Sequence, residues 1–191
     1  MRIRESGMPD EDLWKTFFDI DLIFSKLSIT SSIKDAAEFG AGYGTFSIPA
    51  SKIITGNLYA FDIDENFIEL INKRVRQKKI KNIKIIKRDF VTEGTGLAGE
   101  SVDYVMLFNI LHAENPDILL KESFRILKKN GKAGIIHWIY SKDTPRGPSL
   151  DIRPTEEQCA EWIIEAGFEL NDSKPISLPP YHYGFVAVKN K

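Results

Sequence analysis

A glycine-rich loop and the acids around it are the clearest chemical signal in the sequence. The loop reads E-F-G-A-G-Y-G at residues 38–44, where the first two glycines let the backbone turn sharply and approach a ligand closely. Asp62 follows the first of these glycines by 22 residues, where an acid can accept hydrogen bonds from both hydroxyls of a ribose. Asp89 offers a carboxylate to an exocyclic amine, and Phe90 offers an apolar surface to a purine ring. Together these residues predict a nucleoside site.

The spacing of the glycines restricts the class of nucleoside cofactor that this loop could bind. A dinucleotide site favours G-x-G-x-x-G, whereas this loop reads G-x-G-x-G, with Thr45 in place of the third glycine of that pattern. The motif G-x-x-x-x-G-K-[ST] of nucleoside triphosphate sites does not occur in the sequence. An acid two residues before the first glycine, Glu38, suits a ligand that bears an ammonium group better than one that bears phosphates.

Short β-rich runs alternate with helical stretches and would bring these residues to one edge of a sheet. The runs are 35–39, 57–61, 83–87, 103–109 and 133–140. The fourth and fifth runs are almost continuously apolar, which suits strands covered by helices on both faces. Because open α/β sheets bind ligands at the carboxyl ends of their parallel strands, we expect the loop and the acids to meet there.

The two ends of the chain depart from this alternation. Residues 9–27 predict one or two amphipathic helices, and T-E-E-Q at 155–158 predicts a capping box that opens a helix over 156–166. Two β-like runs follow, 169–178 and 183–189, separated only by P-P-Y-H. So short a connection predicts an antiparallel hairpin.

The composition of the 191 residues is that of one globular domain, with 42% hydrophobic and 28% charged positions. A net charge of −1 argues against a dedicated nucleic-acid binder, and we interpret the nine cations within 73–88 as a solvated face. The single Cys159 excludes a disulfide framework, and three scattered histidines predict no metal site. No apolar run reaches the roughly 18–20 residues that cross a membrane, so we expect a cytoplasmic protein without a span.

Taken together, the motifs resemble the class I S-adenosylmethionine-dependent methyltransferases over residues 33–191. The resemblance rests on E-F-G-A-G-Y-G, Y-A-F-D-I-D, R-D-F, S-V-D-Y-V-M-L-F-N-I-L-H and L-K-K-N-G-K, in that order along the chain. It implies an α/β, Rossmann-like sheet of seven mostly parallel strands in the order 3-2-1-4-5-7-6, with strand 7 antiparallel and helices on both faces. It also implies S-adenosyl-L-methionine as the cofactor. The small-molecule branch, typified by enzymes of ubiquinone and menaquinone biosynthesis, is the most similar.

The resemblance implies a role for each residue of the glycine loop. The backbone of Gly40, Ala41 and Gly42 would hold the methionine part of the cofactor. Glu38 would orient the loop and face the amino group. Tyr43 stands where Thr or Ser is often found, which leaves the role of its side chain open.

Further cofactor contacts are implied at the ends of the next three strands. Asp62 would take the ribose hydroxyls, and Ile63 would pack against the adenine. Asp89 would accept a hydrogen bond from the adenine amine, beside the apolar surface of Phe90. Asn109 would offer its side-chain carbonyl to the amino group of the cofactor.

Methyl transfer from a sulfonium needs alignment and the exclusion of water, and a general base only where the acceptor must lose a proton. His112, just past the fourth strand, is the best candidate for a base or an acceptor contact, and a helix-start histidine bonded to backbone is the alternative. Tyr181 and His182 lie in the turn before the last strand and are candidates to line the acceptor pocket. An ordinary polar hairpin turn is the alternative for both.

The remaining walls of such a pocket would come from extensions of the core. We expect residues 1–32 to form an N-terminal helical extension to a single methyltransferase domain over 33–191. Residues 1–20 would be a lid that orders on binding, and a helix simply packed on the sheet is the alternative. Arg146 and Arg153, after the fifth strand, offer a charge to an anionic acceptor, although we expect both to be solvated.

The sequence therefore predicts a methyltransferase that uses S-adenosyl-L-methionine on a small-molecule acceptor. Two alternatives stay open. One is a methyltransferase that acts on RNA or protein, and the other is a regulatory protein that binds the cofactor without transferring its methyl group.

Overall fold

The computed structural model describes residues 8–190, which form one α/β sheet with its covering helices. The helices are α1 Glu11–Lys15, α2 Ile20–Lys26, α3 Ser47–Ala50, α4 Glu65–Gln77, α5 Pro116–Ile126 and α6 Glu156–Glu165. The strands are β1 Ala36–Phe39, β2 Leu58–Asp62, β3 Ile83–Lys87, β4 Val102–Phe108, β5 Leu127–Trp138, β6 Glu169–Leu170, β7 Ile176–Leu178 and β8 His182–Val188.

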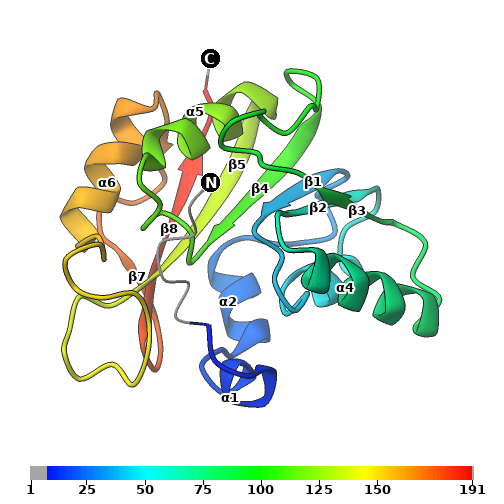
Figure 1. Ribbon diagram of the computed structural model, residues 1–191. Helices are drawn as coiled ribbons and strands as arrows, with labels where there is room; N and C mark the ends of the chain where they lie inside the picture. Colours follow the sequence, from blue (N-terminus) through cyan, green and yellow to red (C-terminus); the bar gives the residue numbers. More distant parts are fainter. Residues whose placement is uncertain (1–7, 191) are drawn as a thin grey trace.

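The strands form one sheet in the order β3-β2-β1-β4-β5-β8-β6, with β7 also paired to β8 (Figure 1). The pairs among β1 to β5 are parallel. In contrast, β8 runs antiparallel to β5, β6 and β7. The strand order that the resemblance implies is therefore confirmed, with β8 as its antiparallel seventh strand and β6 and β7 together as its sixth.

The run 169–178, which the sequence predicts as one strand, is interrupted between β6 and β7. Asp172 begins a turn there, since its Oδ1 accepts a hydrogen bond of 2.9 Å from the backbone N–H of Lys174. Pro175 follows and has no backbone N–H to give to the sheet. The physical reason for the break is thus the turn together with the missing donor.

Helices cover both faces of the sheet, as predicted. Along β4, Tyr104 and Met106 belong to one hydrophobic cluster and Val105 and Leu107 to the other, because alternate residues of a strand face opposite sides. Side chains of α2, α3 and α4 complete the first cluster, and those of α5 and α6 complete the second. The predicted capping box at the start of α6 is also present.

The fold places the carboxyl ends of β1, β2, β4 and β5 at one edge of the sheet. In Figure 1 the two short N-terminal helices, α1 and α2, lie in blue beside this edge. Among residues 8–190 there is no helix that is both long enough and apolar enough to cross a bilayer. The candidate site must therefore be sought where the glycine loop, α1 and the ends of β4 and β5 come together.

Candidate functional site

The glycine loop turns directly after β1 and is tied to the end of β2. Gly40 and Gly42 have φ angles of 77° and 51°, in the left-handed region that glycine adopts without strain. The backbone N–H groups of Gly40 and Ala41 both donate to the carbonyl oxygen of Phe61, each at 2.9 Å. A Cβ added to Gly40 would lie 2.9 Å from Cδ1 of Ile110. The loop is thus a tight turn with no room for side chains on its inner side.

Asp62 ends β2 and holds the loop in place. Its Oδ2 accepts a hydrogen bond of 2.8 Å from the backbone N–H of Gly42, and its Oδ1 accepts one of 3.0 Å from that of Asp64. The residue is only 7% exposed, and burial raises the pKa of its carboxyl group. A carboxylate has about four lone-pair sites, so Asp62 keeps acceptor capacity for a ligand beyond these two bonds.

Glu38 lies beneath the loop rather than in the open space above it. Its carboxyl group is buried and accepts a hydrogen bond from the hydroxyl of Ser47. Burial raises the pKa of Glu38 to about 8. The hydrogen bond from Ser47 acts in the opposite direction and lowers this pKa, whereas the charge of Asp62 raises it further. Glu38 therefore carries a proton at neutral pH. It would have to lose this proton to form an ion pair with an amino group.

Two half-buried residues after β4 have buried polar side-chain atoms without partners among the described residues. Asn109 has a φ of 54°, and neither the oxygen nor the nitrogen of its amide has a hydrogen bond there. The Nδ1 atom of His112 likewise has no hydrogen bond to a described residue. Burial, with a smaller contribution from the charge of Arg153, lowers the pKa of His112 to about 4. Both residues thus offer uncharged hydrogen-bonding atoms to a ligand.

These residues meet in one cavity of about 260 Å³ at the carboxyl edge of the sheet. It combines a polar end, formed by the loop and the ends of β2 and β4, with an aromatic end. Its lining residues are Met8, Trp14, Gly40, Ala41, Gly42, Phe46, Asp62, Ile63, Asp64, Phe67, Phe90, Phe108, Asn109, Ile110, His112, Trp138 and Pro148. Eight of the thirteen residues that the sequence singles out line this cavity.

The other five predicted residues lie outside the cavity lining, and their proposed roles stay predictions. They are Glu38, Tyr43, Asp89, Tyr181 and His182. Asp89 is half-buried after β3, where its Oδ1 accepts hydrogen bonds from the backbone N–H groups of Val91 and Thr92.

Tyr181 and His182 form a layer behind Trp138. The His182 ring lies 4.3 Å from the Trp138 ring and 4.6 Å from that of Phe18, measured between centroids. Tyr181 contacts Phe17 and Trp138 in the same way, at 6.0 and 6.3 Å. His182 is 1% exposed and is the first residue of β8. The expectation that it lies in the turn is wrong, because β8 pairs with β5 as far as Trp138.

The aromatic end is the part of the site that the sequence reasoning missed. Trp138 ends β5, Phe108 ends β4 and Phe46 precedes α3. The Phe46 ring packs edge-on against the Phe108 ring at 4.8 Å, and Trp14 of α1 closes the same space. A signal was present, since the two longest apolar runs each have an aromatic residue, Phe108 or Trp138, near the end where ligands bind.

The N-terminal segment is fastened to the glycine loop through Tyr43. The Tyr43 hydroxyl donates a hydrogen bond of 3.0 Å to the carbonyl oxygen of Pro9. Arg74 of α4 donates to the backbone carbonyl of Tyr43 at 2.7 Å and forms an ion pair with Glu11. These contacts place Met8 over Gly42, where an added Cβ would lie 2.7 Å from Cε of Met8. They give Tyr43 a structural role.

Arg153 is buried, so the expectation that it is solvated is wrong. The residue is 6% exposed. Its guanidinium donates to the carbonyl oxygens of Ile139, Ser141, Arg146 and Pro148 and to the Thr144 hydroxyl, at 2.7–3.3 Å. The physical reason is that the loop after β5 folds its backbone carbonyls around the guanidinium. The side chain of Arg146 is exposed, as expected.

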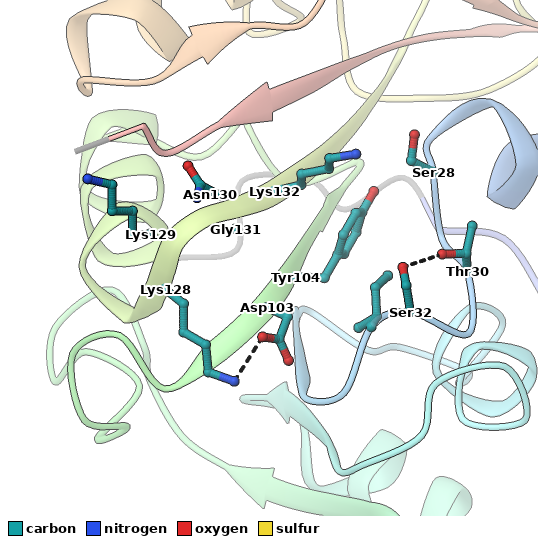
Figure 2. Close-up of a pocket in the computed structure, with 11 residues that line it drawn as sticks. Ser28, Thr30, Ser32, Asp103, Tyr104, Lys128, Lys129, Asn130, Gly131 and Lys132 are labelled. Carbon is teal, nitrogen blue, oxygen red and sulfur yellow. Dashed lines mark hydrogen bonds and ion pairs between the residues drawn. The ribbon is translucent and has the colours of Figure 1, made fainter.

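A larger hollow, of about 470 Å³, lies at the opposite edge of the sheet. Figure 2 shows its polar lining, which comes from residues before β1 and from the beginnings of β4 and β5. Its polar groups pair with one another: Lys128 with Asp103 at 2.8 Å, and the hydroxyls of Thr30 and Ser32 at 2.8 Å. It contains none of the predicted residues, so the smaller cavity is the candidate site. Within residues 8–190 no group of three His, Cys, Asp or Glu side chains is arranged to hold a metal ion.

Comparison with known proteins places this site in context. A family model described as a methyltransferase domain matches residues 36–131. A ribosomal protein L11 methyltransferase of Thermoanaerobacter pseudethanolicus is 30% identical over 133 residues, which are 64% of this chain and 40% of that protein. A demethylmenaquinone methyltransferase of Lactobacillus johnsonii is 27% identical over 117 residues, or 59% of this chain and 47% of that protein. The chain thus spans less than half the length of these relatives.

The fold has solved counterparts as well. The crystal structure of a SAM dependent methyltransferase from Aquifex aeolicus aligns with a TM-score of 0.81 and 20% sequence identity, covering 94% of each chain. At that identity the likeness concerns the fold.

Proposed function

Because the chain belongs to the class I S-adenosylmethionine-dependent methyltransferases, we propose that it transfers a methyl group from S-adenosyl-L-methionine to a small acceptor. The observation that carries this proposal is a single cavity that reaches from the glycine loop to Trp14 and Trp138. A donor at the polar end and an acceptor at the aromatic end would meet inside the protein, where alignment alone is worth roughly 7–11 kcal/mol.

The residues of the polar end fit the cofactor. Asn109 has an unpaired amide oxygen and nitrogen that the cofactor's amino acid part would satisfy. Asp62 retains lone pairs for the ribose hydroxyls, and the bare backbone of Gly40 and Gly42 allows close approach. Ile63 and Phe90 provide the apolar surfaces for the adenine ring.

Three of the predicted residues would act from outside the lining. Glu38 fixes the loop from below through Ser47, and Tyr43 fixes the N-terminal segment over it. Asp89 lies outside the lining and accepts hydrogen bonds from the N–H groups of Val91 and Thr92, so its carboxylate would have to move to reach the adenine amine. We therefore propose Glu38 and Tyr43 as supports of the site and Asp89 as a contact formed on binding.

When bound, S-adenosyl-L-methionine supplies an activated methyl group on a sulfonium. The chain's own residues then have to orient the acceptor, keep water away and accept a proton if one is released. Trp14, Phe108 and Trp138 exclude water from the aromatic end. His112 lines the same cavity with an uncharged imidazole, so it can accept a proton from an acceptor hydroxyl or thiol. We propose this role for His112, whereas Tyr181 and His182 support Trp138 from behind.

A protein acceptor is the second candidate function, because one relative is named as a ribosomal protein L11 methyltransferase. The small cavity, closed on one side by Trp14 and Met8, favours a small acceptor over a folded one. RNA is disfavoured further because several cations of the run 73–88 are engaged within the protein: Arg74 pairs with Glu11, and Lys87 pairs with Glu65.

Two experiments test the proposed function. Calorimetry with S-adenosylmethionine and S-adenosylhomocysteine tests the cofactor, and failure to bind either would overturn the central proposal. Incubation with methyl-labelled S-adenosylmethionine and separate pools of small metabolites, protein and RNA then tests the acceptor. We expect label in the small-molecule pool, while label confined to the protein pool would favour the second candidate. Binding without labelling of any pool would favour a regulatory protein.

A further inference from the structure

The buried Arg153 lies directly behind the aromatic end of the cavity. Its Nε and Nη2 both donate to the carbonyl oxygen of Pro148, at 3.0 and 2.7 Å, and Pro148 lines the cavity. Next to Pro148, a Cβ on Gly147 would lie 2.9 Å from both Nη2 of Arg153 and the ring of Trp138. One layer of atoms therefore separates the guanidinium from the acceptor space.

The positive charge of Arg153 has no counter-ion within the described part of the chain. Each hydrogen bond of its guanidinium to another residue within 8–190 goes to a neutral carbonyl or hydroxyl oxygen. These bonds satisfy its N–H groups and leave its net charge in place. A buried cation of this kind is costly unless an anion is brought to it.

The titratable groups around the guanidinium do not supply that anion. The charge of Arg153 acts on His112, His137 and His182, but burial is the main cause that lowers the pKa of each, so that all three are neutral. Tyr140 and Tyr183 also act electrostatically on the guanidinium. Burial raises the pKa of Tyr183, which keeps its proton.

The carboxylates lie elsewhere. The charged side chains of the loop itself, Lys142, Asp143, Arg146 and Asp151, are exposed. Asp62 lines the polar end of the cavity, and Glu38 lies outside the lining, beneath the glycine loop. Among the described residues, the acids of the cavity lining, Asp62 and Asp64, therefore lie at the end where the cationic cofactor is proposed to bind, and a cation without a counter-ion lies behind the acceptor end.

We propose, building on the methyltransferase function above, that the acceptor is methylated as an anion, a thiolate or phenolate on a small apolar body. Arg153 is the positioning residue whose charge stabilises that anion. We infer an apolar body because the acceptor end of the cavity is lined by the rings of Trp14, Phe46, Phe108 and Trp138. We infer an anionic reacting atom because the cation of Arg153 lies behind these rings.

The charges balance in this step. The proton of the acceptor passes through His112 to solvent as the anion forms in the pocket. A lone pair of the anionic sulfur or oxygen then bonds to the methyl carbon, while the electron pair of the broken carbon–sulfur bond stays on the donor sulfur. Both products are neutral at the reacting atoms. An amine acceptor would instead become a cation beside Arg153, which the same charge disfavours.

The acceptor charge can be observed without turnover. The protein saturated with S-adenosylhomocysteine is titrated with 4-nitrophenol between pH 5 and 9, and the visible absorption of the phenolate reports its ionisation. We expect the pKa of bound 4-nitrophenol to fall about one unit below its value in water, as an opposite charge nearby produces. 4-Nitroaniline, which has the same shape and no acidic hydroxyl, should bind about tenfold more weakly.

Three variants separate charge from structure. Arg153→Gln removes the charge and should return the bound 4-nitrophenol to its pKa in water, with about tenfold weaker binding of the phenolate. Arg153→Lys loses much of the same hydrogen-bond set but keeps the charge, so it should preserve the lowered pKa. Arg146→Gln changes an exposed arginine of the same loop and should have no effect. Circular dichroism of each variant checks that the loop change leaves the fold intact.

The outcomes distinguish the inference from the function on which it rests. Bound 4-nitrophenol that titrates as it does in water, or equal behaviour of Arg153→Lys and Arg153→Gln, overturns the inference while the proposed methyltransferase stands. Absence of S-adenosylhomocysteine binding overturns both. Transfer of labelled methyl to 4-nitrothiophenol or to 4-nitrophenol tells a sulfur from an oxygen acceptor, and faster transfer to 4-nitroaniline than to either contradicts an anionic acceptor.

Discussion

The backbone N–H of Gly42 donates a hydrogen bond of 2.8 Å to Oδ2 of Asp62. The acid at the end of β2 thereby fixes the turn that follows β1, and the same carboxylate faces the cavity. The shape of the glycine loop and the proposed recognition of ribose therefore depend on one side chain.

Asp62→Ala should weaken the binding of S-adenosylmethionine and S-adenosylhomocysteine alike, because it removes both the support of the loop and the acceptor of the ribose hydroxyls. Hydrogen bonds to a charged group contribute about 1.5–3 kcal/mol, so we expect a Kd raised about 10- to 100-fold in calorimetry. Asp62→Asn keeps an oxygen for the Gly42 N–H and should lose less. Unchanged affinity in Asp62→Ala would refute the ribose assignment.

Glu38 makes the stability of the protein depend on pH in a direction opposite to that of most carboxyl groups. Its pKa rises from 4.5 to about 8 on folding, so the folded state binds the additional proton between these values. Its contribution to the free energy of unfolding is therefore complete below pH 4.5 and is lost as the pH rises through 8, by up to about 1.4 kcal/mol per pH unit.

Glu38→Gln should flatten this dependence, because glutamine is neutral at every pH and can still accept the hydrogen bond from Ser47. Urea unfolding at pH 6.5 and pH 8 measures the difference, because the histidines contribute equally to the wild type and the variant. Parallel slopes in the wild type and the variant would show that Glu38 does not titrate there.

The three histidines of the chain should stay neutral over the physiological range. Burial lowers the pKa of His112 to about 4 and that of His182 to about 3, and it lowers that of His137 well below its ordinary value. The folded state thus binds fewer protons than the unfolded one, and stability falls as the pH drops below 6.5. Proton NMR of the imidazole rings between pH 5.5 and 8 should show no titration, whereas a midpoint near 6.5 for any of them would contradict their burial.

The N-terminal segment should become better protected when the cofactor binds. Glu11→Gln removes its ion pair with Arg74 and should raise amide exchange over residues 8–18 in the free protein. Asp12→Asn, at an exposed neighbouring acid of α1, is the matched control and should leave exchange unchanged.

Addition of S-adenosylhomocysteine should reduce exchange in the same segment of the wild type. Equal protection with and without the ligand would mean that α1 is simply packed on the sheet rather than a lid.

The polar half of the site could be predicted from the sequence because its signals are local. The glycines, Asp62 and Asn109 each stand at the end of a recognisable strand, and parallel strands bring such ends together. A residue's identity and its distance from a strand end were sufficient to place it.

The aromatic half could not be predicted, because it depends on pairing between distant segments. His182 lies behind Trp138 because the antiparallel register of β5 and β8 pairs these two residues. No local sequence pattern predicts where that pairing begins. Arg153 is buried because carbonyl groups of its own loop fold around its guanidinium. The sequence of a loop does not predict such a backbone conformation. Burial of a charge is thus a tertiary property that composition alone predicts wrongly.

The position of β3 at one edge of the sheet gives the basic run 73–88 a further meaning. An unpaired edge strand offers its backbone to any passing chain, and charged side chains, above all lysine, are the usual protection against such pairing. Lys84 and Lys87 project from β3 into solvent, while the opposite edge is made only of the short strands β6 and β7. Both edges of the sheet therefore disfavour pairing with a strand from another molecule, and the lysines of β3 reduce the tendency to aggregate.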